Sequence, residues 1–453
     1  MADKPNEAKA PAPADLTGDC RLDPKLQNRN ALLYAAQISL IYLAAPALYI
    51  GFVQAGLFKH MHTSDTVANL PSTVFLSMAW APVVVAWLFP QARALTRIIG
   101  LSYWLMALMG GLVALALFAD VSEPVLIAAI IAHAAVIGAA NPVANVLGWE
   151  VLDRGVSKKL RGKALGLAFG WGPCFAVVGS LGAQLLLDGK LFGWTAPPWL
   201  SVPYPYSYGV LFGISAACMA VAGLLSRLYR IELPKVDVER ESFRVAVVDG
   251  FKSLLGYRIL FIACIAYLLV YSGNMVQINM SIFTQEAVGR MPEDLAGYQL
   301  TLRFTFKIFC GFLLGWLLTR TNPKVPLLVT VGLQILGVLW VLFVPGYWFL
   351  IAFGINGAGE LFGVYYMNYP AQASPKSQVR RNIAFLALIS TLVGFAPVFY
   401  GWISDTWSLR ASFWAALFIL SCVTLLVIFA LPSNPKPRLQ DMRDSDREPS
   451  PAA

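Results

Sequence analysis

Residues 230–258 read RIELPKVDVERESFRVAVVDGFKSLLGYR, the longest hydrophilic stretch inside an otherwise apolar chain. Of the 453 residues, 58% are hydrophobic and only 13% are charged. Soluble proteins carry about 25% charged residues, so this composition indicates an integral membrane protein. The hydrophilic stretch lies near the middle of the chain and divides its long apolar runs into two sets.

Each set contains six runs of about 20 residues, the length that crosses a bilayer as a helix. We therefore predict an all-α polytopic membrane protein with twelve transmembrane helices. The N-terminal bundle, 31–229, is predicted to contain the spans 31–57, 68–89, 98–119, 125–149, 164–187 and 207–229. The C-terminal bundle, 257–432, is predicted to contain the spans 257–283, 298–319, 325–344, 347–369, 382–404 and 410–432.

The segments outside the bundles are polar. Residues 1–30 and 433–453 are expected to be disordered tails, and 1–30 lacks the apolar core of a signal peptide. If both tails and the linker 230–256 are cytoplasmic, most Lys and Arg residues outside the spans fall on the cytoplasmic side. The opposite side then keeps only Lys59, Lys190, Arg290 and Arg410. This asymmetry predicts cytoplasmic termini.

The formal net charge of +9 is explained by the same basic cytoplasmic segments. Basic cytoplasmic loops that contact anionic lipid heads explain this charge better than nucleic-acid binding does. We expect the plasma membrane, which is the inner membrane in a bacterium, as the location.

The two halves share their pattern of turns. WLFPQARALTRIIGL (87–101) and WLLTRTNPKVPLLVT (316–330) each give Trp-Leu, a short basic turn and a new apolar helix. RGKALGLAFGWGPCFAVVG (161–179) and RRNIAFLALISTLVGFAPVFYG (380–401) are basic-led helices with a Gly-Pro type of break. A repeat of this length predicts two equivalent six-helix units, an arrangement found in one large class of transporters.

With these features the chain resembles the major facilitator superfamily over all twelve spans. GWLLTRTNPKVPLL (315–328) is similar to the superfamily's Gly-x-x-x-Asp-Arg/Lys-x-Gly-Arg-Arg turn, although Thr319 stands near the acidic position. GWISDTWSLRASFW (401–414) is also similar to the family. The resemblance implies a solute transporter in which two six-helix bundles rock around a central site, lined mainly by spans one, four, seven and ten.

Three ionisable residues lie deep within predicted spans. YQLTLRFTFKIFCGFLLGWLLT (298–319) places Arg303 and Lys307 four residues apart, on one face of a helix. Lys307 lies roughly 14 Å into its span, near the middle of the bilayer, and Glu360 of the tenth span has a similar depth. A charge at such a depth costs about 3 kcal/mol or more, so each of these residues needs a partner or a role.

Two readings of these charges are open. Glu360 is either the counter-ion of Arg303 or Lys307 in a buried pair, or a proton site whose partners change during transport. Arg303 could also extend its long side chain toward the membrane surface. His133 in the fourth span is a second candidate for proton coupling.

Uncharged polar residues occur on the four spans expected to line the site. Alone, each is explained by an interhelical hydrogen bond worth under about 1 kcal/mol. Together they are typical of a site for a polar organic solute. The candidate substrate-binding residues are Arg303, Lys307, Asn141, Asn145, Asn274, Gln277, Asn356, Gln37 and Tyr271.

We therefore expect a proton-coupled secondary transporter for a small, polar, anionic organic solute, acting as a monomer in the bilayer. One alternative is a drug or metabolite efflux antiporter, because GLAFGWGPCFAVVG (166–179) is similar to a motif of such exchangers. Another is a non-transporting assembly factor or receptor. The sequence shows no nucleophile–base pair, nucleotide loop or metal-ligand spacing, so we expect no enzyme, cofactor or metal site.

Overall fold

The computed structural model describes residues 20, 22–49, 51–198, 201–233, 242–244, 248, 250–374 and 379–435. Most of these residues are helical, and their only strands are β1 (Lys190–Leu191) and β2 (Trp194–Thr195), a short antiparallel hairpin. Within the described ranges, eleven helical segments are long and apolar enough to cross a membrane. They correspond to predicted spans two to twelve, and the first span is divided as described below. The chain is a multi-pass integral membrane protein.

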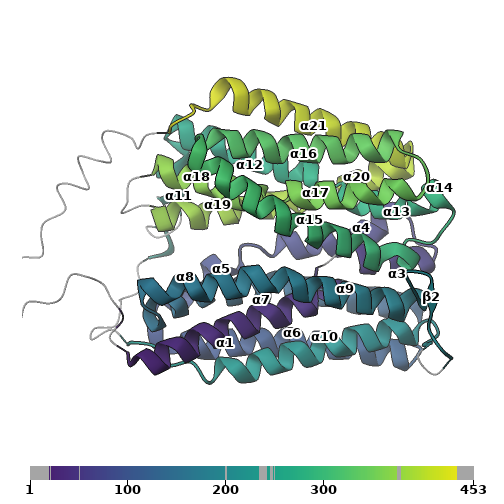
Figure 1. Ribbon diagram of the computed structural model, residues 1–453, viewed down its shortest axis with the longest axis horizontal. Helices are drawn as coiled ribbons and strands as arrows, with labels where there is room; N and C mark the ends of the chain where they lie inside the picture. Colours follow the sequence, from purple (N-terminus) through teal and green to yellow (C-terminus); the bar gives the residue numbers. More distant parts are fainter. Residues whose placement is uncertain are drawn as a thin grey trace, which may run out of the picture.

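The N-terminal half forms most of the lower part of Figure 1. Its helices pack through a core of small and branched apolar side chains. Its elements are α1 (Pro24–Leu43), α2 (Ala45–Leu48), α3 (Phe52–His60), α4 (Asp65–Ser77), α5 (Ala81–Leu88), η1 (Ala92–Ala94), α6 (Leu95–Phe118), α7 (Glu123–Gly155), α8 (Lys158–Gly166), η2 (Leu167–Trp171), α9 (Gly172–Asp188) and α10 (Tyr206–Ser226).

The C-terminal half forms the upper part of Figure 1. It begins with the short helix α11 (Gly250–Leu255), which lies within the predicted linker. The remaining elements are α12 (Arg258–Asn274), α13 (Gln277–Ile282), α14 (Thr284–Val288), α15 (Glu293–Arg320), α16 (Lys324–Phe343), η4 (Gly346–Leu350), α17 (Ile351–Gly359), α18 (Phe362–Ala373), α19 (Val379–Val393), α20 (Phe395–Thr406) and α21 (Leu409–Ala430).

The predicted first span, 31–57, is wrong in its start and in its continuity. α1 begins earlier, at Pro24, because the Asp23 side chain accepts a hydrogen bond from the backbone of Lys25 and caps the helix. The helical path is interrupted at Ala44 and again at Gly51, whose φ of 152° is readily adopted only by glycine. Residues 1–19 and 21 of the predicted N-terminal tail lie outside the described residues.

Several other spans are also interrupted, although hydropathy predicts them as continuous helices. The second is divided between α4 and α5, and the fifth contains the π-helical turn η2. The seventh is divided between α12 and α13, and the eleventh between α19 and α20. The tenth is divided at Glu360 and Leu361, between α17 and α18, so a candidate site residue lies at a helix break.

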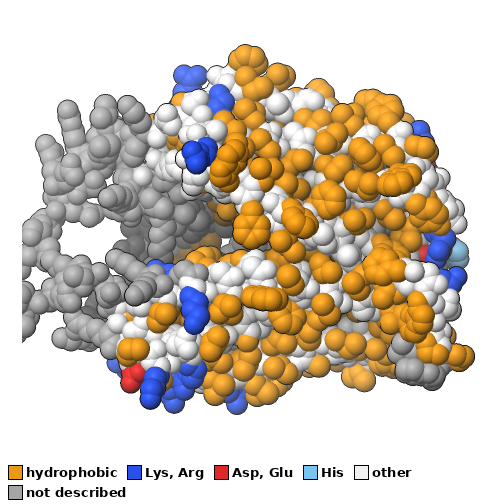
Figure 2. Space-filling model, viewed as in Figure 1, with side chains coloured by type: hydrophobic (Ala, Val, Ile, Leu, Met, Phe, Trp, Pro, Cys, Tyr) orange, Lys and Arg blue, Asp and Glu red, His pale blue; other side chains and the backbone are white. Residues whose placement is uncertain are grey.

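The first and last helices share one end of the molecule. α1 begins and α21 ends on the left of Figure 1, whereas β2, α3 and α14 lie on the right. We call the right-hand end, away from the start of α1 and the end of α21, the distal end. Figure 2 shows apolar side chains covering the middle of the visible face, with most Lys and Arg side chains nearer its two ends. This distribution fits a surface that faces lipid.

Candidate functional site

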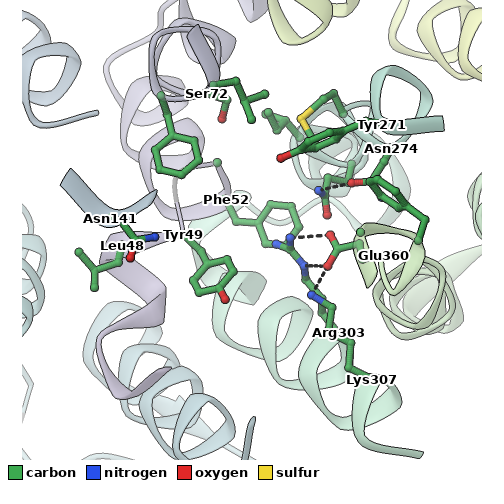
Figure 3. A pocket seen from close by; sticks show the side chains of 18 of the residues that line it. Leu48, Tyr49, Phe52, Ser72, Asn141, Tyr271, Asn274, Arg303, Lys307 and Glu360 are labelled. Atoms are coloured by element: carbon green, nitrogen blue, oxygen red, sulfur yellow. Dashed lines mark hydrogen bonds and ion pairs between the residues drawn. The ribbon is translucent and has the colours of Figure 1, made fainter. Parts of the chain in front are cut away.

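A cavity of about 350 Å³ lies between the two halves. It is lined from both sides, which is what a site used by both bundles requires. Figure 3 shows Tyr49, Phe52, Ser72 and Asn141 of the N-terminal half facing Tyr271, Asn274, Arg303, Lys307 and Glu360 of the C-terminal half.

Three charged side chains meet in this cavity. Arg303 forms a bidentate ion pair with Glu360: Nη2 lies 2.5 Å from Oε1, and Nε donates to Oε2 at 2.9 Å. The Lys307 ammonium also pairs with Glu360 Oε2. The Glu360 side chain is only 7% exposed, against 12% for Arg303 and 19% for Lys307. The predicted counter-ion geometry is therefore present, with one carboxylate serving two cations and one positive charge left over.

Glycines on α17 allow α15 to come close enough for this pairing. A Cβ added at Gly357 would lie 2.4 Å from the backbone oxygen of Arg303, and one at Gly354 would lie 2.7 Å from the Phe306 ring. α17 then ends at Gly359, and the chain turns at Glu360 before α18 begins. The Glu360 carboxylate therefore extends from the break between α17 and α18, and not from the side of a continuous helix.

Aromatic rings of the N-terminal half hold the other side of Arg303. Its guanidinium carbon lies 5.2 Å from the centre of the Phe52 ring and 5.8 Å from that of Tyr49. Such cation–π contacts contribute about 0.5–2 kcal/mol each. Arg303 therefore links the two halves through contacts that the sequence analysis missed. Within a continuous apolar span, no sequence signal distinguishes a cavity-lining ring from a lipid-facing one.

The predicted amides of the seventh and tenth spans form a chain of hydrogen bonds. Gln277 donates to Asn274 Oδ1 at 3.2 Å, and Asn274 donates to Asn356 Oδ1 at 3.1 Å. Asn274 and Gln277 line the cavity, whereas Asn356 is buried behind them and is not a lining residue. Asn356 is therefore linked to the cavity lining by its hydrogen bond with Asn274.

The other predicted neutral residues of the cavity come from α7 and α12. Asn141 lines the cavity, while Asn145 lies one turn away and donates to Asn141 Oδ1 at 3.4 Å. Tyr271 also lines it, with its ring centre 5.2 Å from that of Phe362. Asn145 is thus adjacent to the cavity and not part of its lining.

Gln37 and His133, two further candidate site residues, are not among the residues that line the cavity. Gln37 accepts a 2.6 Å hydrogen bond from the Tyr229 hydroxyl and donates to the Ala222 carbonyl at 2.8 Å, so it joins α1 to α10. His133 is buried within the N-terminal half with its ring 5.2 Å from that of Phe212. Neither of its ring nitrogens has a hydrogen-bond partner among the described residues.

Polar contacts join the two halves at the distal end. His60 Nδ1 lies 2.7 Å from Glu293 Oε1 across the interface. The Asp405 carboxylate accepts hydrogen bonds from the backbone nitrogens of Asp65, at 2.8 Å, and Thr66, at 2.9 Å. We call these five residues the distal contact zone. Nearby, Arg290 pairs with Asp188 at 2.6 Å, and its hydrogen bond to Asp294 raises the pKa of Arg290 above its usual value.

The sequence profile described as Major Facilitator Superfamily matches residues 266–450. No curated protein sequence matches the chain. Among solved structures, a mutant of the nucleoside transporter NupG has a TM-score of 0.64 at 12% identity, covering 89% of this chain and 99% of that chain. A D-xylose–proton symporter has a TM-score of 0.63 at 12% identity, covering 89% and 98%. A mutant of the E. coli fucose–proton symporter FucP has a TM-score of 0.54 at 17% identity, covering 89% and 97%. At these identities the likeness shows the fold.

Proposed function

Because the chain has the Major Facilitator Superfamily fold and matches its profile in the second half, we propose that it is a proton-coupled secondary transporter. Its solute is a small, polar, anionic organic molecule, and it works as a monomer by alternating access in the plasma membrane. The observation that carries this proposal is the Arg303–Glu360–Lys307 cluster in a cavity shared by both halves.

The excess charge supports an anionic solute. Two cations and one carboxylate give the cluster a formal charge of +1. An unpaired positive charge within a membrane is costly, so an anion that enters the cavity relieves that cost. Lys307, the more exposed of the two cations, is the group the anion meets first.

Protonation of Glu360 provides the coupling. When the carboxylate takes up a proton, both cations lose their counter-ion and the cluster's attraction for an anion increases. Binding of the proton and binding of the anion therefore reinforce each other, as thermodynamic linkage requires. Arg303 also contacts Phe52 of the opposite half, so a change at Glu360 reaches the interface between the halves.

Uptake into proteoliposomes with an imposed pH gradient tests the proposal. The probes are radiolabelled monocarboxylates and dicarboxylates. We expect Lys307→Ala to reduce uptake more than tenfold, and Glu360→Gln to transport at a rate that no longer depends on the pH gradient. Lys190→Ala, an exposed cation of the distal hairpin, serves as the control and should keep both properties. Unchanged pH-driven uptake in both cavity variants would overturn the mechanism.

An efflux antiporter of the same fold is the second candidate, favoured by the aromatic and apolar part of the cavity lining. It predicts broad substrates, and Arg303→Ala would then change specificity without abolishing flux. A non-transporting assembly factor or receptor would instead co-purify with a partner and move no solute. In the fifth span, Gly172 and Gly179 serve close helix packing, because an added Cβ would lie 2.3 Å from the Tyr42 ring and 2.1 Å from the Leu43 backbone oxygen, respectively. Gly166 and Gly170 have no such neighbour within 4 Å.

A further inference from the structure

We propose that the solute is an aromatic monocarboxylate, held by its charge at Lys307 and Arg303 and by its ring between aromatic walls of the two halves. This inference rests on the proposed anion transport and specifies the substrate class of the same cavity. Three independent features carry it: the net charge of the lining, the aromatic rings on both sides and the cavity volume.

The charge of the lining selects a monoanion. Arg303, Lys307 and Glu360 are the charged residues among those that line the cavity in the described part of the chain. With Glu360 ionised, as its two ion pairs require, their sum is one positive charge, so a single carboxylate brings the cavity to neutrality. In that state a dicarboxylate would leave one negative charge in a site enclosed by transmembrane helices, and a cation would add to the existing excess.

A three-ring wall lies on the C-terminal side. Tyr267 and Tyr271 come from α12 and Phe362 from the first turn of α18. Their ring centres are separated by 5.2–6.2 Å, the spacing of offset or edge-on aromatic contacts. All three line the cavity, so a planar substrate ring can join this cluster.

A second set of rings lies on the N-terminal side. Tyr49, Phe52 and Phe75 all line the cavity from that half. Tyr49 and Phe52 already lie near the Arg303 guanidinium, so the cationic group and the aromatic surface are adjacent. Figure 3 shows Tyr49, Phe52 and Tyr271 arranged around the Arg303–Glu360 pair. A carboxylate attached to a ring matches this combination, whereas an aliphatic acid leaves the rings unused.

The cavity size limits the aromatic part. Its volume of about 350 Å³ lies at the lower end of the range for small-molecule sites. One or two rings fit this space. The cavity amides Asn141 and Gln277 are available for a ring hydroxyl or carbonyl, although each can also bond to water.

Counterflow in proteoliposomes with a matched set of probes tests the inference. The set is benzoate, 2-naphthoate, cyclohexanecarboxylate, phthalate and benzylamine. We expect benzoate and 2-naphthoate to exchange best and benzylamine not to exchange. Cyclohexanecarboxylate has the same charge as benzoate and a similar size, but no π-system. It should be about three- to tenfold poorer, the factor expected from aromatic contacts.

Variants of the ring wall give a second readout. Tyr271→Leu and Phe362→Leu should bring the ratio of benzoate to cyclohexanecarboxylate exchange close to one, because they remove the rings while keeping the charges. Phe429→Leu, on the exposed surface of α21, is the control and should keep the wild-type ratio.

The outcomes separate this inference from the proposed function. Equal exchange of benzoate and cyclohexanecarboxylate, or a preference for phthalate, would overturn the aromatic monocarboxylate and leave anion transport standing. No exchange of any probe would likewise overturn the aromatic monocarboxylate, and the uptake assay with other carboxylates then decides anion transport. Exchange of benzylamine but of no acid would overturn both.

Discussion

Glu360 is the residue on which two cations of α15 converge. Arg303 and Lys307 lie one helical turn apart, so their charges repel unless a carboxylate separates them. Glu360 bonds to both, and its side chain is only 7% exposed. Burial of such a cluster is weak evidence for net stabilisation, but removal of one partner leaves an uncompensated buried charge. The arrangement therefore predicts strong dependence of each charge on the others.

A double-mutant cycle measures this dependence. Glu360→Gln should lower the free energy of unfolding by about 3–5 kcal/mol, since it leaves two cations unpaired. Adding Lys307→Met to that variant should restore much of the loss, because only Arg303 then remains charged. Thermal unfolding of the purified protein in detergent gives the four values. Additive losses in the double variant would contradict a shared cluster.

Apolar substitutions at His133 and Gln37 should have different effects on stability. His133→Leu removes ring nitrogens that have no partner among the described residues, so stability and pH-driven uptake should both be kept. Gln37→Leu breaks bonds to Tyr229 and Ala222 and should lower stability by about 1–3 kcal/mol. Thermal unfolding and uptake assays on both variants check this contrast. Loss of proton coupling in His133→Leu with an intact fold would restore the coupling role.

At the scale of single residues, the sequence could predict the charges better than their surroundings. Arg303, Lys307 and Glu360 stand out because a charge within a span is costly, and their similar depths predicted that they could meet. Gln37 gave a similar signal, but its hydrogen-bonding capacity is used between α1 and α10. Phe52 could not be recognised, since an aromatic side chain in a span fits the cavity, the core and lipid equally well.

At the scale of the helix, small residues decide how closely α15 and α17 approach. Gly354 and Gly357 both face α15, and Gly359 faces Gln334 of α16, where an added Cβ would lie 2.7 Å from the side chain. The glycine-rich stretch predicted close packing of the tenth span. Its interruption at Glu360 was not predicted, because hydropathy averages over a whole span and does not detect a local change in backbone hydrogen bonding.

Gly357→Ala tests the close approach. The new methyl group would lie 2.4 Å from the backbone oxygen of Arg303, and a backbone atom cannot move aside cheaply. We expect a loss of about 1–3 kcal/mol in stability, the usual cost of overpacking, together with weaker substrate binding. An added Cβ at Gly363 in the same span would have no neighbour within 4 Å, so Gly363→Ala is the matched control for stability. Equal thermal stability of the two variants would contradict this role for Gly357.

At the scale of the whole molecule, the six-plus-six division was predictable from hydropathy and the central hydrophilic stretch. The sequence could not predict at which end the two halves are in contact. Rocking changes the contacts between the halves without changing the spans themselves. The structure shows the halves joined at the distal end, where Asp405 of α20 bonds to the first backbone nitrogens of α4. Ser404 bonds to Asp65 at the same place. The family-like stretch 401–414 thus supplies a cap for a helix of the other half.

Opening of the distal end should follow when these contacts are weakened. Asp405→Asn removes the negative charge at the start of α4, and Glu293→Gln removes the charged partner of His60. Hydrogen bonds to charged groups contribute about 1.5–3 kcal/mol each, enough to shift a two-state equilibrium more than tenfold. The double variant should therefore favour the arrangement in which the distal contact zone is separated.

Spin labels at Thr195 of β2 and Gln285 of α14, both exposed at the distal end, report the separation by double electron–electron resonance. We expect a population with a longer distance between the two labels in each single variant. This population should be larger in the double variant. Glu286→Gln, an exposed carboxylate of α14, is the control and should keep the original distribution. An unchanged distance distribution in the double variant would contradict this role for the distal contact zone. Other contacts between the halves, such as the Arg290–Asp188 pair, would then keep the distal end closed.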